Sequence, residues 1–170
     1  RQRARRVLEA ELPADRREIV RRYSRRAPKL NGQAPRGRGT FAKHCGACHR
    51  VNDVGRQVGP DLTALTDRSV NRMATAIFAP DRAVEARYMR YVVTTVDGRS
   101  FTGAIVAESG NGITLADTLG KTRKIARSRI RRMVSTGQSL MPVGLEQALS
   151  PQDLADILAF LRRESGTTAN

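Results

Sequence analysis

Residues 45–49 read Cys45-Gly46-Ala47-Cys48-His49, and this stretch decides the fold that we expect for the chain. Two cysteines three positions apart can form thioether bonds to the two vinyl groups of a haem, and a histidine directly after them can bind its iron. If the stretch closes a helical turn, both sulfurs meet one edge of the porphyrin and His49 lies on the axis normal to the ring. The stretch therefore predicts a c-type haem attached at Cys45 and Cys48, with His49 as an axial ligand.

The same letters also fit a redox-active dithiol, half of a zinc site, or chance. A redox dithiol of the thioredoxin kind follows a strand in a βαβ unit, and a zinc site needs two more Cys or His ligands. Outside the motif the chain has no cysteine and one histidine, His44, which as the neighbour of Cys45 is poorly placed to complete a tetrahedron. Haem attachment is the interpretation that the residues favour.

Length and cysteine content limit the architecture. A chain of 170 residues can bury one good core or two small ones, and both of its cysteines lie in the motif, so none is left for a structural disulfide. No stretch has the length of a transmembrane helix or the apolar region of a signal peptide, and the chain begins with Arg1, which indicates a mature or excised piece of something longer. Because haem of this kind is attached outside the cytoplasmic membrane, we expect a periplasmic or equivalent location.

The net charge of +15 comes mostly from arginine, with one basic group within residues 1–38 and another within residues 121–132. Such a field favours acidic proteins, anionic lipid or nucleic acid. Aromatic residues are scarce and no nucleic-acid-binding motif accompanies the charge, so we expect no nucleic-acid partner. An acidic docking face on a redox partner fits better, and a solvated basic surface is the plainer alternative.

The start of the chain predicts a basic helical extension followed by a linker. Residues 1–12 read as the tail of a helix, and a second helix follows Pro13 over residues 14–26. Proline and glycine then break the pattern, so residues 27–35 are expected to form a linker. The segment has little apolar surface of its own and resembles the end of a helical array.

Two helices far apart in the sequence are expected to enclose the haem. Gly37, Phe41 and Cys45 are spaced four apart and share one face of a helix. A glycine allows another helix to cross closely, and Phe41 can pack beside the porphyrin edge. The matching helix begins with the capping sequence at Ser150 and carries an apolar stripe over residues 154–161. An ordinary helix pair is the plainer alternative.

The stretch VGPDL at residues 58–62 is expected to orient the proximal histidine. The carbonyl group of Pro60, held near the imidazole, could accept the Nδ1 hydrogen of His49 and raise its strength as a ligand. Gly59 and Pro60 are therefore candidate cofactor-binding residues, although a plain Gly-Pro turn fits the same letters. A short helix is expected next, over residues 66–78.

The periodicity changes to that of strands over residues 87–136. Asp97-Gly98 is a strong hairpin signal, and Leu119-Gly120 marks a second turn. The expected strands cover residues 88–96, 100–108, 113–117, 122–126 and 130–134. Short strands at this spacing predict a small barrel or a strongly twisted sheet, inserted between the two halves of the haem domain.

Four methionines are candidates for the axial position opposite His49. Met73 lies on the apolar stripe of a helix, and Met89 and Met133 lie in or beside strands, so all three are expected to fill cores. Met141 stands in a loop just before the last helix, and a loop can present its sulfur to iron. Methionine is a known axial partner of histidine in cytochromes of this class, which makes Met141 the candidate.

Several stretches resemble the CxxCH haem-binding domain at the C-terminal end of large predicted dehydrogenases of planctomycete and verrucomicrobial bacteria. They are GRGTFAKHCGACHRV, VGPDLTAL, VVTTVDGRSFTGAIV, SLMPVGLEQALSPQDLADILAFL and the helical lead-in before Pro35, and they cover nearly the whole chain. The resemblance implies a class I cytochrome c core with an inserted β-domain, with His49 proximal and Met141 distal. It also implies that helical repeats or a β-propeller with sugar-dehydrogenase likeness precede this piece.

These features together predict a mainly α fold, in which a class I cytochrome c-like helical haem fold carries an inserted small antiparallel β-domain and an N-terminal helical extension. The expected division is residues 1–35 for the basic extension and linker, residues 36–86 plus 137–170 for the haem domain, and residues 87–136 for the inserted sheet or barrel.

One covalently attached haem c per chain is expected, with iron bound by His49 and Met141 and no site left for a substrate. The chain would then carry single electrons for a redox partner or an upstream dehydrogenase domain, without a substrate site of its own. Two alternatives stay open. The chain could be a haem enzyme or gas sensor with a displaceable distal ligand, or a partner-binding module that uses the inserted sheet and the basic face.

Overall fold

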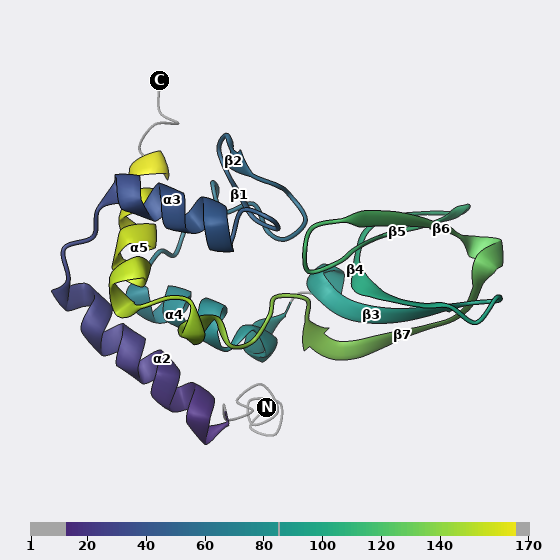
Figure 1. Cartoon of the computed structure of the whole chain (residues 1–170), viewed down its shortest axis with the longest axis horizontal. Helices are drawn as coiled ribbons and strands as arrows, with labels where there is room; N and C mark the ends of the chain where they lie inside the picture. Colours follow the sequence, from purple (N-terminus) through teal and green to yellow (C-terminus); the bar gives the residue numbers. More distant parts are fainter. Residues whose placement is uncertain (1–12, 85, 166–170) are drawn as a thin grey trace, which may run out of the picture.

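The computed structural model describes residues 13–84 and 86–165, and it consists of a helical part and a sheet part that lie side by side (Figure 1). The described helical part contains the α-helices α2 (Ala14–Arg26), α3 (Ala34–His44), α4 (Val70–Phe78) and α5 (Pro151–Ser165). The helix tail expected over residues 1–12 lies outside the described residues. Strands make up 28% of the chain, so the expected mainly α class is only partly correct.

Two helices begin at other residues than expected. Helix α3 begins at Ala34, so Pro35 lies in its first turn rather than in the linker, because proline has no N–H to lose there. Helix α4 begins at Val70 rather than at Thr66, because the side chain of Ser69 caps its first turn. Helix α2 has the expected bounds.

Helices α3 and α5 cross at Gly37, as the spacing predicts (Figure 1). A Cβ atom on Gly37 would lie 2.0 Å from the carbonyl oxygen of Asp156, so this close approach requires glycine. Phe41 and Phe160 pack beside the crossing, with their ring centroids 5.6 Å apart. The crossing thus joins two segments that lie more than a hundred positions apart in the sequence.

Asp156 is a buried carboxylate at this crossing, with 2% of its surface exposed. It accepts hydrogen bonds from the Arg36 guanidinium at 2.9 and 3.0 Å, from the Gln33 N–H at 2.7 Å and from the Gln152 amide at 3.0 Å. Burial alone would raise the pKa of Asp156, but these hydrogen bonds outweigh burial and leave the pKa lowered. The charged carboxylate therefore ties the start of α3 to α5.

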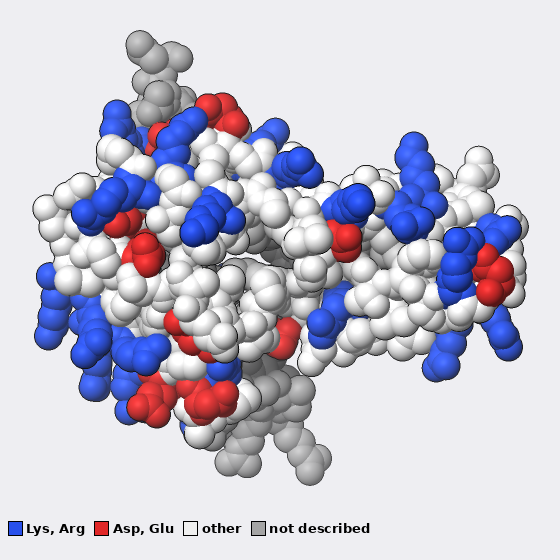
Figure 2. All heavy atoms as spheres, in the orientation of Figure 1, with Lys and Arg blue, Asp and Glu red and all other residues white. Residues whose placement is uncertain are grey.

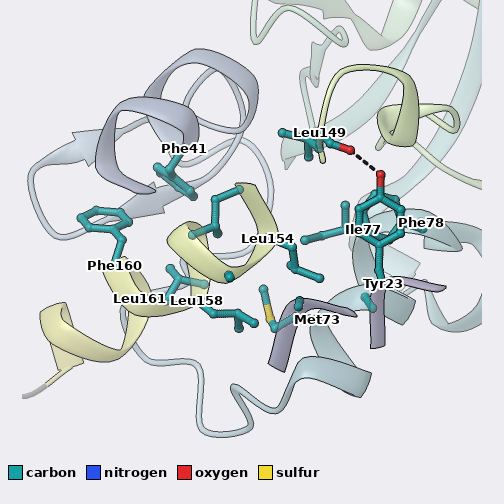
Figure 3. Close-up of a cluster of buried hydrophobic side chains, with 14 of the residues drawn as sticks. Tyr23, Phe41, Met73, Ile77, Phe78, Leu149, Leu154, Leu158, Phe160 and Leu161 are labelled. Atoms are coloured by element: carbon teal, nitrogen blue, oxygen red, sulfur yellow. Dashed lines mark hydrogen bonds between the residues drawn. The ribbon is translucent and has the colours of Figure 1, made fainter. Parts of the chain in front are cut away.

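A single cluster of buried side chains connects the four helices (Figure 3). Tyr23 of α2 packs against Phe78 of α4 with ring centroids 4.0 Å apart, and its hydroxyl donates a hydrogen bond to the carbonyl group of Leu149. Met73 is buried in the same cluster, which confirms its expected place in the core. Other members are Phe41, Ile77, Leu154, Leu158, Phe160 and Leu161. Helix α2 is therefore packed into the core of the helical part.

The sheet part is a five-stranded antiparallel sheet in the order β6-β5-β4-β3-β7. Its strands are β3 (Met89–Thr95), β4 (Ser100–Ser109), β5 (Gly112–Ala116), β6 (Thr122–Ala126) and β7 (Ile130–Ser139). All five expected strands are confirmed, and the last one continues to Ser139, well beyond the expected end. A two-stranded sheet of β1 (Arg50–Val51) and β2 (Val54–Gly55) follows the cysteine motif and was not expected.

Strand β4 bends between the part that pairs with β3 and the part that pairs with β5. Its first half pairs with β3 up to Gly103, and its second half pairs with β5 from Ala104 onward, with a register shift between Ile105 and Ala107. Such an irregularity bends a strand. The bend brings the end of the sheet that holds the β5–β6 turn back toward the helical part (Figure 1).

The sheet has its own small core of Val93, Ile113, Leu115 and Ile125. Met133 was expected to fill this core, but 37% of its surface is exposed, so that expectation is wrong. Met133 pairs directly with the buried Val93, but it lies on the edge strand β7, whose residues 131–138 are all exposed.

Basic side chains are spread over both parts of the visible surface, with a group along α2 (Figure 2). Several are paired with acids on the surface, including Arg38 with Asp53 and Arg127 with Glu108. Among the described residues, no helix is both long and apolar enough to cross a bilayer.

Candidate haem-attachment site

The cysteine motif forms a compact turn at the end of α3. The N–H of Cys45 donates to the carbonyl group of Phe41 at 2.8 Å, and the N–H groups of Cys48 and His49 donate to the carbonyl group of Cys45 at 3.1 and 2.9 Å. This is the helical turn that the spacing predicts. It places two free, half-buried thiols and one imidazole on the same short loop.

Both thiols are protonated at neutral pH. Burial, followed by the neighbouring Cys48, raises the pKa of Cys45 to about 12. Burial, followed by the charge of Asp117, also raises the pKa of Cys48. A redox-active dithiol needs a lowered pKa on its attacking thiol, so these surroundings disfavour that interpretation of the motif.

His49 is oriented by a backbone acceptor. Its Nδ1 atom lies 2.9 Å from the carbonyl oxygen of Pro60, the contact expected from the sequence. A carbonyl oxygen can only accept, so Nδ1 carries the ring hydrogen and Nε2 keeps a free lone pair. Burial lowers the pKa of His49 and the bond to Pro60 opposes this only in part, so the imidazole is neutral, which is the form that binds a metal.

Gly59 lies flat against the imidazole ring of His49. A Cβ atom at this position would lie 2.9 Å from Cε1 and 3.2 Å from Nδ1 of the ring. Any side chain at position 59 would therefore displace the imidazole or the loop. Gly59 and Pro60 together determine where the ring lies and which of its nitrogen atoms is free.

The segment that follows β2 wraps closely around the motif. The N–H groups of Val58 and Gly59 both donate to the carbonyl group of Cys48, at 2.9 and 2.7 Å. Gly55 has a φ of +89°, and a Cβ atom on it would lie 2.1 Å from the carbonyl oxygen of His49. The backbone of the motif is therefore held from two sides by residues that come directly after it.

The remaining candidates are Phe41, which precedes the motif, and Met141, which lies far beyond it. Phe41 is fully buried against Phe160, within the helical core. Met141 is half-buried in the loop between β7 and the short helix η5 (Leu145–Gln147), where its N–H donates to the Ser139 hydroxyl at 3.1 Å. Met141 and Cys45 pack against the same cluster of buried side chains. Their roles toward a haem remain predictions.

One contact with the site comes from a distant turn that no single motif indicates. Gly120 in the β5–β6 turn has a φ of +73°, and a Cβ atom on it would lie 2.2 Å from the carbonyl oxygen of Ala47. In the same turn, the carbonyl oxygen of Thr118 lies 3.7 Å from the Sγ atom of Cys48. No local signal could have indicated this, because 70 positions separate Cys48 from Thr118.

Residues 34–91 match the family model described as Cytochrome c. No curated protein matches the chain. The matched residues run from the start of α3 through the motif and α4 into β3, where the sheet begins. Together with the CxxC pair, the match implies a covalently bound haem c, and it indicates a haem-based electron-transfer module that works with a redox partner. The local structure fits that group, because it supplies two free thiols and an oriented, neutral imidazole on one turn.

Proposed function

We propose that the chain is a monohaem c-type cytochrome module that carries single electrons, with His49 as a ligand of the haem iron. The observation that carries this proposal is the contact between Nδ1 of His49 and the carbonyl oxygen of Pro60, because it leaves Nε2 free to bind iron. When bound, the haem iron supplies a one-electron redox couple. The chain would hold the group through Cys45 and Cys48 and tune it through the surroundings of His49.

The protein environment of His49 would influence the redox couple in three ways. The hydrogen bond to Pro60 increases the electron density on the imidazole and so strengthens its bond to the oxidised metal. Contact with Gly59 keeps the plane of the ring in one orientation. The half-buried position of His49 limits its contact with water, which affects the reduction potential of a bound metal group.

Met141 is the distal ligand in this proposal. Three observations support it: the residue lies in a loop, it is half-buried, and it packs against the same cluster as the attachment residue Cys45. With His49 on one side and Met141 on the other, no axial position would remain for a substrate. The chain would then transfer electrons without a substrate site of its own.

The electron donor in this proposal is an attached or partner dehydrogenase, and the module works in the periplasm or an equivalent compartment. Cytochrome c domains are typically found outside the cytoplasm, which supports the location. The net charge of +15 supports a donor or acceptor with an acidic docking face, since opposite charges accelerate encounter. Rates of electron transfer to acidic and basic carrier proteins, measured at rising ionic strength, test this.

Visible spectra of the purified protein in both oxidation states test the proposal. We expect the α-band of c-type haem after reduction and the weak far-red band of an iron–methionine bond after oxidation. Met141→Ala should remove the far-red band and lower the midpoint potential, whereas Met133→Ala, on the exposed edge strand β7, should change neither. An unchanged Met141→Ala spectrum would contradict methionine ligation, and rapid uptake of carbon monoxide by the native protein would favour a haem enzyme or gas sensor.

A further inference from the structure

The turn between β5 and β6 is internally braced. The Oδ1 atom of Asp117 accepts hydrogen bonds from the N–H groups of Leu119 and Lys121, each at 2.9 Å. Backbone bonds from Asp117 to Lys121 and from Gly120 to Asp117, each 3.0 Å long, close the turn. A turn held in this way has little freedom to change shape, so whatever it contacts is held in place as well.

This braced turn contacts the cysteine motif at one backbone atom and one side-chain atom. Gly120 is buried, and its Cα approaches so closely that a Cβ atom would lie 2.2 Å from the carbonyl oxygen of Ala47. The carbonyl oxygen of Thr118 lies 3.7 Å from Sγ of Cys48. Ala47 and Cys48 are the third and fourth residues of the motif, so the contact falls directly on the attachment turn.

The contact depends on the curvature of the sheet. Strand β4 bends where it passes from β3 to β5, with a register shift between Ile105 and Ala107, and Gly103 lies beside this bend, where a Cβ atom would lie 2.3 Å from the carbonyl oxygen of Ala116. That bend directs the β5–β6 turn toward the helical part (Figure 1). A flat hairpin of the same length would point elsewhere, so the shape of the inserted sheet is what brings the turn to the motif.

Asp117 also influences the motif electrostatically. It directly precedes Thr118, whose carbonyl oxygen lies 3.7 Å from Sγ of Cys48, so its carboxylate stands close to the motif. A negative charge close to a redox centre stabilises the oxidised form, which carries more positive charge, and so lowers the reduction potential. Both backbone hydrogen bonds to Asp117 go to the same oxygen, so an asparagine could preserve them while removing the charge.

We propose that the β5–β6 turn is a wall of the haem pocket, in which Gly120 positions the attachment turn and the carboxylate of Asp117 lowers the reduction potential. The inserted sheet is then a working part of the redox site. This inference rests on the proposed cytochrome function, and its tests use readouts that separate the two.

Gly120→Ala tests the contact. The added methyl group would collide with the carbonyl group of Ala47, so amide hydrogen exchange in the peptide that contains residues 45–49 should accelerate several-fold. Gly98→Ala is the matched control, because Gly98 has a similar φ of +81° in the β3–β4 turn of the same sheet, with nothing within 4 Å of its Cβ position. Equal exchange of the motif in the two variants would overturn the contact.

Asp117→Asn tests the charge. The midpoint potential should rise in this variant, because the negative charge is removed while the turn is preserved. Glu108→Gln removes one negative charge from the same sheet, at its exposed pair with Arg127 near the β6–β7 connection at the far end (Figure 1), and should leave the midpoint almost unchanged. Equal midpoints for Asp117→Asn and Glu108→Gln would overturn the electrostatic role.

These outcomes are distinct from a failure of the proposed function. If the native protein shows no c-type haem spectrum, the cytochrome assignment fails, and the exchange contrast between Gly120→Ala and Gly98→Ala still reports whether the turn holds the motif. If the spectrum is that of haem c and the variants match their controls, the cytochrome assignment stands and the role of the turn is rejected.

Discussion

The Nδ1 atom of His49 lies 2.9 Å from the carbonyl oxygen of Pro60, and this contact leaves Nε2 as the ring nitrogen that can bind a metal. The acceptor is a backbone atom, so its position depends on the course of residues 58–60 and not on a side chain. Because those residues also bond to the carbonyl group of Cys48, the attachment turn and the histidine acceptor move as one unit.

Gly59→Ala should disturb this unit. The new methyl group would lie 2.9 Å from Cε1 of His49, so we expect a shifted midpoint potential and a loss of stability of about 1–3 kcal/mol, as for other overpacked sites. Voltammetry and urea unfolding of the purified protein measure the two effects. Pro60→Ala is the control, because it retains the carbonyl acceptor and should leave the midpoint close to that of the native protein.

Gly37→Ala should separate the two crossing helices. Its Cβ would lie 2.0 Å from the carbonyl oxygen of Asp156, a backbone atom that cannot rotate away, and we expect a loss of about 3 kcal/mol or more. Gly39→Ala in the same helix meets nothing within 4 Å and should stabilise the protein by up to about 1 kcal/mol. Thermal unfolding compares them, and similar melting temperatures would refute the close crossing.

The stability of the protein should fall in acid partly through Asp156. Its pKa is lowered in the folded state, so its contribution is complete above the ordinary value of 3.8 and disappears as the pH falls through the lowered pKa. Asp156→Asn should lower the free energy of unfolding by about 2 kcal/mol at neutral pH. The free energy of unfolding of this variant should also fall less steeply in acid. Urea unfolding between about pH 6 and about pH 2 measures both effects.

The control for Asp156 is Asp53→Asn, which removes a carboxylate whose pair with Arg38 lies on the surface, with 72% of the Asp53 side chain exposed. Exposed pairs contribute little to stability, so this variant should behave almost like the native protein at neutral pH. An Asp156→Asn variant as stable as Asp53→Asn would show that the buried carboxylate does not hold the helix crossing together.

Tyr23→Phe should weaken the attachment of α2 to the core. The substitution keeps the ring against Phe78 but removes the hydrogen bond to the carbonyl group of Leu149, and we expect a loss of about 1–2 kcal/mol. Thermal unfolding measures it. Tyr91→Phe is the control, because Tyr91 is half-buried and its hydroxyl makes no hydrogen bond within the described residues. Equal losses in both variants would argue against a structural role for the buried hydroxyl.

Local patterns predicted the elements and the proximal half of the site well. The spacing of Cys45, Cys48 and His49 predicts one helical turn, the glycine at position 37 predicts a helix crossing, and Asp97-Gly98 predicts a hairpin; the structure contains all three. Each of these depends on residues that are neighbours in the chain or on the size of one side chain.

Errors arose where competing local signals or distant partners decided the outcome. Pro35 was interpreted as a helix breaker, although a proline is equally suited to the first turn of a helix, where α3 places it. The pattern around Met133 predicts a place in the sheet core; Met133 does pair with the buried Val93, but it stays exposed because β7 is an edge strand. The ion pair of Arg36 with the buried Asp156 gave no signal in either segment.

The sequence by itself determined the chemistry at the attachment turn, since thioether formation and axial ligation depend on residue types at fixed short spacing. Only the tertiary structure decided that the braced turn at Asp117–Gly120 contacts Ala47 and Cys48. The physical reason is that the bend of β4 and the packing of the helices are set by many contacts between distant segments, and no pattern within one segment encodes them.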